Sequence, residues 1–205
     1  MKPPLSRRIK YLSKINTSAL PESTPPDREI RYVDISSVGR GIVQAEPALL
    51  TFESAPSRAR RLVKHGDTIV STVRTYLRAV LPIRNPQPDL VVSTGFAVLT
   101  PGPDLIPDYF SWVLQSDMFI DEVVARSVGV SYPGINAGEI GDIRVPFPVL
   151  ADQQRIAEYL DAETARIDAL IEKSQRMIDL LRERRQALIT ASVTSEHEVP
   201  GLRHE

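Results

Sequence analysis

The pattern of hydrophobic and polar residues changes near residue 150. Before that point, short apolar and β-branched runs alternate with turn residues, and most of the 17 prolines of the chain lie there. From residue 151 to residue 192 there is no proline or glycine, and apolar positions recur at helical spacing. The pattern predicts a mixed domain over residues 1–150, one long helix over residues 151–192, and a flexible tail over residues 193–205.

Three runs in residues 1–150 have the composition of strands, namely 30–38, 67–81 and 90–100. Residues 107–127 differ, because apolar side chains such as Tyr109, Val113 and Phe119 follow a helical period after Pro107. Glycines and prolines punctuate residues 128–149, which favours a loop with one short strand. We therefore predict an α+β fold, with a small mixed or antiparallel sheet and packed helices.

The predicted long helix has the pattern of a coiled coil. Asp152 is a suitable N-cap residue, and about 40 residues at about 1.5 Å each form a rod roughly 60 Å long. Apolar residues recur every seven positions, with Glu163, Ser174 and Arg184 as polar interruptions. We call the apolar positions of this heptad the apolar seam. Its members are Ile156, Leu160, Ile167, Leu170, Met177, Leu181 and Leu188.

A domain of 150 residues can cover one end of such a rod but leaves the rest of the apolar seam in water. In one interpretation, the helix folds back on its own domain or is one helix of a larger monomer. We favour contact with the same helix of a second copy, because no other helix of comparable length is predicted in the chain. The expected assembly is a two-fold symmetric homodimer, in which the polar interruptions fix the register.

Charge is unevenly distributed along the chain. The formal net charge is only -1, yet residues 1–90 carry +7 and residues 91–150 carry -5. Residues 57–80, here called the arginine segment, contain five arginines and a lysine. Clustered arginines favour a phosphate-bearing polymer such as double-stranded DNA, because binding releases counterions. The alternative interpretation is a solvated basic face with no ligand.

The arginine segment supplies most candidate DNA-binding residues. If residues 67–81 form a strand, Thr72, Arg74, Tyr76 and Arg78 share one basic face, while the other face packs. Just before this strand, further arginines are placed to meet phosphates or the edge of guanine. They are Arg58, Arg60 and Arg61. Alternatively, any one of these arginines is an ordinary surface or ion-pair residue.

The stretch SVGVSYPGIN, residues 127–136, is a second candidate contact region. Its glycines allow the backbone to approach a surface closely, and Ser131, Tyr132 and Asn136 offer donors and acceptors for base edges or phosphates. The alternative is a structural loop that buries Tyr132 and Ile135 against the preceding helix.

The residues of a catalytic site are missing from the sequence. There is no cysteine, no acidic residue stands two places before any lysine, and neither a phosphate-binding loop nor a dinucleotide-binding glycine motif occurs. The histidines His65, His197 and His204 are not spaced as metal ligands. No apolar run is long enough for a signal peptide or a membrane span. We expect a non-catalytic, metal-free, cytoplasmic protein that binds no cofactor itself.

Several motifs together resemble one protein family. They are SRARRLVKHGDTIVSTVRTYLRAV, STGFAVLTP, PDYFSWVLQSD, SVGVSYPGINAGEIGDIRVPFP, QQRIAEYLDAETARIDALIEK and LLRERRQALITASVT. In this order they resemble segments of the specificity (S) subunits of type I restriction-modification systems, over roughly residues 5 to 195. Because several unrelated motifs agree in order and spacing, the resemblance is specific.

The resemblance implies a target recognition domain followed by a spacer helix. A typical member contains two such units, which read the two halves of a bipartite DNA site, and it assembles with modification (M) subunits that carry S-adenosylmethionine. In the restriction complex, motor-nuclease (R) subunits join them. This sequence has one unit and so resembles a half S subunit, which as a homodimer would read an interrupted palindrome.

Two other functions remain open at this stage. One is an S-like fragment that docks by its helix on another S subunit and reads no DNA. The other is a stand-alone nuclease, which the missing site motifs oppose. The loop SVGVSYPGIN resembles its counterparts in proteins that read different sequences, so we favour the structural interpretation of that loop. Base reading is then expected in the less recognisable stretches, 36–58 and 82–92.

Overall fold

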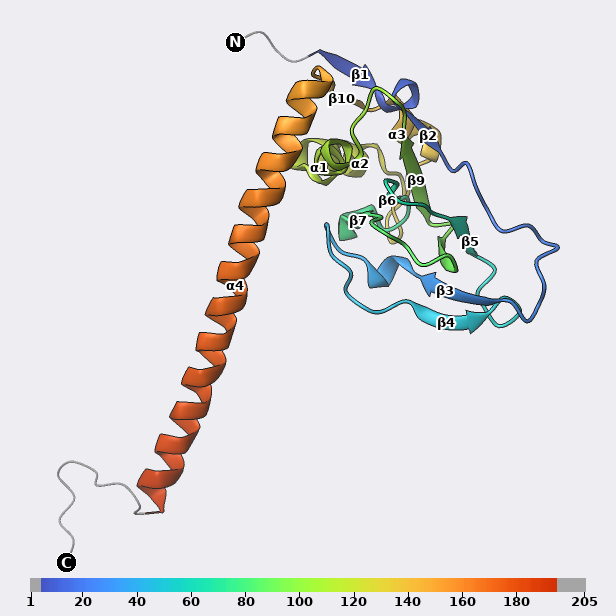
Figure 1. The fold of residues 1–205 in the computed structure, drawn as a ribbon. Coiled ribbons are helices and arrows are strands. Elements are labelled where there is room, and N and C mark those ends of the chain that lie inside the picture. Colours follow the sequence, from blue (N-terminus) through green and yellow to red (C-terminus); the bar gives the residue numbers. More distant parts are fainter. Residues whose placement is uncertain (1–4, 195–205) are drawn as a thin grey trace, which may run out of the picture. The chain divides into compact units, whose positions relative to one another are not determined.

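The computed structural model describes residues 5–194. These residues fall into two compact units, one ending at Ala157 and one beginning at Glu158, and each is described by itself. The first unit holds three sheets and three short helices together with the first turns of the long helix (Figure 1). Residues 195–205, most of the predicted tail, lie outside the described residues.

Two four-stranded sheets form the body of the first unit. One is antiparallel throughout and has the strand order β2 (Ser13–Ile15), β9 (Phe96–Pro101), β6 (Thr68–Ser71), β7 (Val80–Pro82). The other has the order β4 (Ala48–Thr51), β3 (Glu29–Val33), β8 (Leu90–Ser93), β5 (Ala59–Leu62), and only β3 and β8 run parallel. Consecutive strands β8 and β9 thus belong to different sheets.

A third, two-stranded sheet and three helices complete the unit. Strand β1 (Ser6–Arg8) pairs antiparallel with β10 (Arg144–Pro146). Helices α1 (Pro107–Gln115), α2 (Asp117–Arg126) and α3 (Ala137–Asp142) lie between β9 and β10 in sequence. The main core joins Phe110, Leu114 and Phe119 of the helices to Val70 and Leu99 of the antiparallel sheet. The predicted α+β class is confirmed.

The prediction of a single strand over residues 67–81 is wrong. Strand β6 ends at Ser71, a 3₁₀ turn follows at Thr75–Leu77, and β7 pairs back on β6 as the second arm of a hairpin. Arg74 and Arg78, on either side of the turn, have φ angles of 51° and 53°. A strand residue has a strongly negative φ, so the predicted alternation of faces does not apply to these side chains.

Two other predicted strands are shorter than expected. Residues 30–38 form β3 only to Val33, and a 3₁₀ turn occupies Ile35–Ser37. Residues 90–100 form β8 and β9, separated by Thr94 and Gly95. In the first case the apolar run continues through the turn because Ile35 is itself buried. In the second case the turn consists of the exposed Thr94 and the partly buried Gly95.

The single helix predicted over residues 107–127 is broken at Ser116. Its hydroxyl donates to the Val113 carbonyl (2.6 Å) and accepts from the Phe119 N–H (3.4 Å), so Ser116 caps α2. Local hydrogen bonding of this kind competes with continuation of a helix. The loop predicted for residues 128–149 also contains a helix, α3, before its short strand β10.

The long helix α4 spans Leu150–Val193, which is 44 residues. It begins before the predicted start, so Asp152 lies in its first turn instead of preceding it. Its first turns belong to the first unit, where Gln153 and Ala157 are buried. Gln153 accepts a hydrogen bond from the Ile106 N–H (2.9 Å) and donates to the carbonyls of Asp104 (3.2 Å) and Pro148 (2.9 Å). These bonds fix the start of α4 to the first unit.

Candidate nucleic-acid interface

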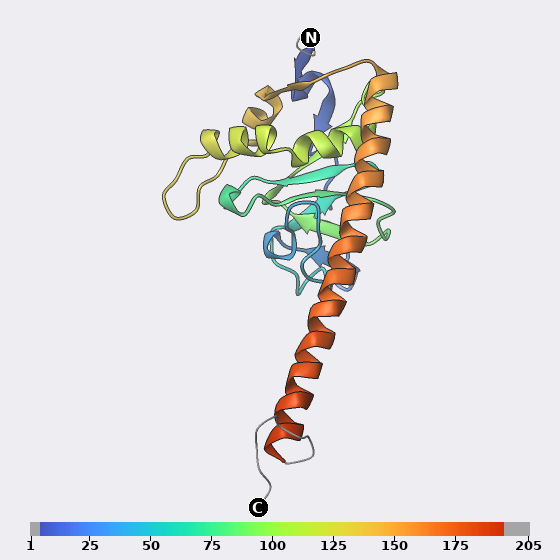
Figure 2. The same cartoon turned by 90° about the vertical axis from the view of Figure 1, so that its left-hand side faces the viewer.

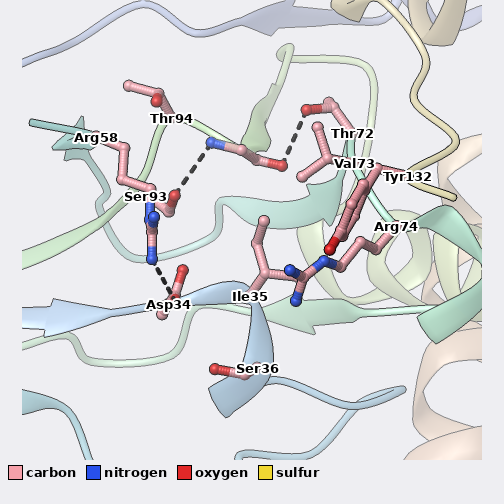
Figure 3. Close-up of a pocket in the computed structure, with 11 residues that line it drawn as sticks. Asp34, Ile35, Ser36, Arg58, Thr72, Val73, Arg74, Ser93, Thr94 and Tyr132 are labelled. Atoms are coloured by element: carbon pink, nitrogen blue, oxygen red, sulfur yellow. Dashed lines mark hydrogen bonds and ion pairs between the residues drawn. The ribbon is translucent and has the colours of Figure 1, made fainter. Parts of the chain in front are cut away.

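A hollow of about 450 Å³, here called the pocket, opens in the first unit where the two four-stranded sheets meet (Figure 3). Strands β3, β6 and β8 all end beside it, and β5 begins there. Polar and apolar groups of the segments that follow these strands form its walls. The lining residues are Asp34, Ile35, Ser36, Arg58, Thr72, Val73, Arg74, Ser93, Thr94, Gly95 and Tyr132.

Arg58 is held on one wall of the pocket by two partners. Its Nε donates to the Tyr32 hydroxyl (3.0 Å) and its Nη2 to Asp34 Oδ2 (2.9 Å), while the Tyr32 hydroxyl donates to Asp34 Oδ1 (3.3 Å). The hydrogen bonds that Arg58 donates to the Tyr32 hydroxyl and to the Asp34 carboxylate raise the pKa of its guanidinium, and the bond to Tyr32 contributes most. Arg58 is therefore a fixed, charge-compensated part of the wall.

Arg74 lies on the wall contributed by the β6–β7 hairpin and stacks on an aromatic ring. Its guanidinium carbon is 4.9 Å from the centroid of the Tyr132 ring, and the two side chains lie alongside each other in Figure 3. Cation–π stacking of this kind holds a guanidinium in one plane while leaving its N–H edges available. Both side chains are exposed.

The loop that carries Tyr132 is anchored at its base. The N–H of Ile135 donates to the Thr72 carbonyl (2.9 Å), and Val128 and Gly134 exchange backbone hydrogen bonds across the loop (2.8 and 3.0 Å). Ile135 is buried, while Tyr132 is 67% exposed and Val130 fully exposed. In Figure 2 this loop, drawn yellow, extends outward from the end of α2. The structural interpretation of the loop is thus right for Ile135 and wrong for Tyr132.

Gly95 closes the floor of the pocket. Thr72 donates to its carbonyl from both the backbone N–H (2.8 Å) and the hydroxyl (2.9 Å). A Cβ at this position would lie 2.5 Å from Ile35 Cδ1 and 3.2 Å from Val73 Cγ2. A side chain at residue 95 would require Ile35 and Val73 to shift, so glycine allows the β8–β9 turn to approach them closely.

The structure separates the remaining arginines of the arginine segment from the pocket. Arg60 stacks on Phe52, with 4.3 Å between its guanidinium carbon and the ring centroid. Arg61 is half-buried on β5, and its Nε has no hydrogen-bond partner among the described residues. Arg78 makes ion pairs with Asp117 (3.3 Å) and Asp121 (2.9 Å) of α2. Arg78 therefore matches the ion-pair alternative considered from the sequence.

The other predicted contact residues lie outside the pocket lining. Tyr76 is 53% exposed on the 3₁₀ turn of the hairpin, and Ser131 is exposed in the loop. Asn136 is the N-cap of α3, where its backbone N–H donates to Glu139 Oε2 (2.9 Å). Of the nine predicted DNA-binding residues, the pocket brings together three, which are Arg58, Arg74 and Tyr132.

Sequence reasoning missed several pocket residues, among them Asp34, Thr94 and Gly95. A signal was present, because Asp34 interrupts the β-rich run 30–38 and Thr94-Gly95 interrupts the run 90–100. Both are places where a strand ends, which is where loop-borne functional residues collect. Ser36 and Arg58 do lie within one of the two stretches, 36–58, that were expected to read bases.

Within residues 5–194 there is no group of three His, Asp or Glu side chains arranged to hold a metal ion. Over the same residues, none of the helices is both long and apolar enough to span a membrane.

Comparison with known proteins decides the family. A family model described as the type I restriction modification DNA specificity domain matches residues 26–179, which include the whole pocket and most of α4. The chain belongs to this family. The resemblance inferred from the sequence motifs is thereby confirmed.

One relative of the specificity domain is the type I restriction enzyme StySPI specificity subunit of Salmonella potsdam. The two sequences are 28% identical over 96 residues, which cover 47% of this chain and 21% of that subunit. The MjaIX specificity subunit of Methanocaldococcus jannaschii is 23% identical over 165 residues, 80% of this chain and 34% of that subunit. The chain thus spans well under half the length of these relatives.

Solved structures share the fold of this specificity domain. The HsdS subunit from Thermoanaerobacter tengcongensis matches all of this chain with a TM-score of 0.74 at 23% identity, and the match covers 52% of that subunit. A chain from a structure of a type I R-M system, described in terms of complex assembly and conformational transition, matches with a TM-score of 0.76, also at 23% identity and 52% coverage.

The second unit of the specificity domain consists of the remainder of α4. Six of the seven residues of the apolar seam are exposed, with exposed fractions between 39% for Ile156 and 57% for Leu170, and Leu160 is partly buried. Ile171 and Ile178 widen the exposed stripe. The helix therefore has the surface of one strand of a coiled coil.

Proposed function

We propose that the chain is a DNA-sequence-recognition subunit of a type I restriction-modification system. Two copies pair through α4, each first unit reads one half of an interrupted palindromic site in double-stranded DNA, and the assembly recruits M subunits and, for restriction, R subunits. The chain is itself non-catalytic and binds no cofactor, because methyl transfer from S-adenosylmethionine belongs to the M subunits. Its cytoplasmic location remains a prediction.

The pocket is the observation that carries DNA recognition. It combines a stacked arginine with hydroxyl groups of Ser36 and Thr94 and with the apolar side chains of Ile35 and Val73. Reading a base edge needs this mixture, since hydrogen bonds and apolar contacts must both match. The match of residues 26–179 to a DNA specificity domain supports the same function.

The apolar seam supports pairing. Leaving the exposed leucine, isoleucine and methionine side chains of α4 in water is unfavourable by about 25 cal/mol for each Å² of apolar surface that a partner could cover. A second copy presents the same heptad, so a two-fold axis makes the seams self-complementary. Two domains related by that axis read two copies of one half-site in inverted orientation.

Selection of DNA by the purified full-length chain tests the proposal. From a pool of random duplexes, the wild-type protein is expected to enrich an interrupted palindrome, and gel shifts should show affinity that falls steeply as salt rises. Light scattering on the same sample should give the mass of a dimer. A monomer that enriches no sequence, either alone or with M subunits added, would overturn the proposal and would favour the alternative of a fragment that docks on another S subunit.

A control with M subunits separates recognition from assembly. If the chain alone enriches no sequence but does so after M subunits are added, recognition stands and requires the complex. If neither sample selects a sequence, the recognition function is wrong. Methylation of DNA by the chain alone would contradict the non-catalytic assignment.

A further inference from the structure

Two arginines in the β6–β7 hairpin share an uncommon backbone conformation, but one is paired with carboxylates and the other lies beside an aromatic ring. Arg74 and Arg78 flank the 3₁₀ turn Thr75–Leu77, and both have positive φ. For a residue other than glycine this conformation costs free energy, and it persists where the surrounding structure requires it. In Arg78 it directs the guanidinium to the carboxylates of Asp117 and Asp121.

Arg74 faces the pocket instead. Among the ion pairs of the described residues, none includes Arg74, whose contact is the ring of Tyr132. The other arginine of the pocket, Arg58, is paired with Asp34 at 2.9 Å. The positive charge that the pocket offers to a ligand therefore resides on Arg74.

The position of Arg74 suits a planar ligand with two acceptors. Stacking on Tyr132 holds the guanidinium flat, so two of its N–H groups point along one edge as a fork. Guanine offers two acceptors, O6 and N7, on its major-groove edge, and the bidentate pair with arginine is the commonest specific contact to DNA. We propose that Arg74 reads a guanine of the half-site and that Tyr132 is its positioning residue. This inference rests on the proposed function. It departs from the expectation that bases are read within 36–58 and 82–92, because Arg58 of that stretch is paired with Asp34 whereas Arg74 is stacked on Tyr132 beside the pocket.

A phosphate is the other acceptor that DNA offers, and the surroundings favour guanine. The planar fork of an arginine binds phosphate oxygens as well as a guanine edge, so the guanidinium alone does not distinguish the two ligands. Its neighbours do, because Ile35 and Val73 present apolar groups in the same hollow. An apolar wall suits the body of a base and is poorly suited to a charged phosphate.

The test uses chemically altered duplexes of the site that the wild-type chain selects. In one series, each guanine of the half-site is replaced in turn by 7-deazaguanine, which lacks the N7 acceptor. In the other, each phosphate is replaced by an uncharged methylphosphonate. For the wild type, 7-deazaguanine at one position is expected to weaken binding about 10-fold, as for loss of a good base contact.

Four variants assign that loss to the stacked pair. Arg74→Ala should bind more weakly and should no longer distinguish guanine from 7-deazaguanine at that position. Arg74→Lys retains the charge but replaces the planar fork by a single ammonium, so it should keep the salt dependence of binding and distinguish guanine from 7-deazaguanine less sharply. Tyr132→Ala should reduce the distinction, while Tyr132→Phe, which keeps the ring, should retain it.

Arg78→Ala is the matched control. It removes an arginine of the same conformation from the same hairpin, and because its ion pairs are exposed it should affect folding little. It should respond to 7-deazaguanine as the wild type does. Thermal melting of every variant shows which are folded, and Arg74→Lys provides the test if Arg74→Ala is not.

The possible outcomes are distinct. If folded Arg74 variants respond to each 7-deazaguanine as the wild type does, the inference is wrong while the proposed function stands. If Arg74→Ala instead becomes insensitive to one methylphosphonate, Arg74 contacts a phosphate and guanine reading is overturned. If the selected half-site contains no guanine, the inference also fails. If the wild type selects no DNA at all, with or without M subunits, the proposed function fails and the inference fails with it.

Discussion

Arginine side chains of the same segment differ in role because their neighbours differ. Arg78 is paired with carboxylates, Arg60 stacks on Phe52, and Arg74 stacks on Tyr132 at the pocket. The sequence predicts that arginines gather in residues 57–80, since composition is visible there. It cannot tell them apart, because Asp117 and Tyr132 are far away in sequence and only the fold brings them near.

Gly95 shows how one residue shapes the pocket. In Gly95→Ala the new methyl group would collide with Ile35 Cδ1, which lies 2.5 Å from the Cβ position, and would press on Val73. We expect a loss of about 1–3 kcal/mol in the free energy of unfolding, as for other overpacked sites, and weaker selection of DNA. Urea unfolding and gel shifts measure the two effects.

Gly138→Ala is the control for that substitution. Gly138 lies in α3, and a Cβ there would meet nothing within 4 Å. Alanine is also the better helix former, so this variant should be as stable as the wild type or slightly more stable. Equal stability of Gly95→Ala and Gly138→Ala would contradict the close packing of the pocket floor.

For single helices and strands, the sequence predicts which kind of element forms better than it predicts where the element begins and ends. Residues 151–192 contain no helix breaker and include the heptad of the apolar seam, and the helix is present as expected. The β6–β7 hairpin and the break at Ser116 are missed, because each depends on local features that apolar periodicity does not contain. In the hairpin, the local feature is the positive φ of Arg74 and Arg78. At the break, it is the hydrogen bond from the Ser116 hydroxyl to the last turn of α1.

Gln153 joins helix α4 to the first unit. It is fully buried and makes three hydrogen bonds to backbone groups of Ile106, Asp104 and Pro148. In Gln153→Ala these groups lose their partners, so we expect the free energy of unfolding of the first unit to fall by about 2–4 kcal/mol. Urea denaturation followed by the fluorescence of Trp112 gives this value.

Gln186→Ala provides the comparison within α4. Gln186 is an exposed residue of the same helix, and alanine there should change stability by less than about 0.5 kcal/mol. A similar effect of both substitutions would mean that the hydrogen bonds of Gln153 contribute nothing special to the attachment of the helix.

For the whole molecule, fold class and the pattern of the helix follow from the sequence, whereas the pocket does not. Periodicity acts over neighbouring residues, so it predicts a mixed domain and a rod with an apolar seam. The pocket is contributed by segments around residues 34–36, 58, 72–74, 93–95 and 132, whose meeting depends on how two sheets adjoin. A sequence pattern does not specify that packing.

Pairing of two chains is also tested at this scale. Ile167→Glu combined with Leu181→Glu places four carboxylates in a symmetric apolar seam, where burying an unpaired charge is costly. We expect light scattering to show a monomer, with DNA affinity reduced because each monomer holds one half-site. A dimer formed by this double variant would rule out pairing through the seam.

The matched control places the same charges elsewhere on the helix. Ala165→Glu with Gln186→Glu adds two carboxylates to exposed positions outside the heptad seam. This variant should remain a dimer and bind DNA as the wild type does, apart from a modest electrostatic effect.

The division of β8 and β9 between two sheets has a consequence for folding in the cell. The pocket exists only after both sheets have formed and the Thr94–Gly95 link has settled between them, because each sheet supplies separate walls. A newly synthesised chain that has completed one sheet therefore lacks the pocket walls that the other sheet supplies. Under the proposed function, such an immature copy could not yet select a DNA sequence, and no separate inhibitor would be needed to prevent it from doing so.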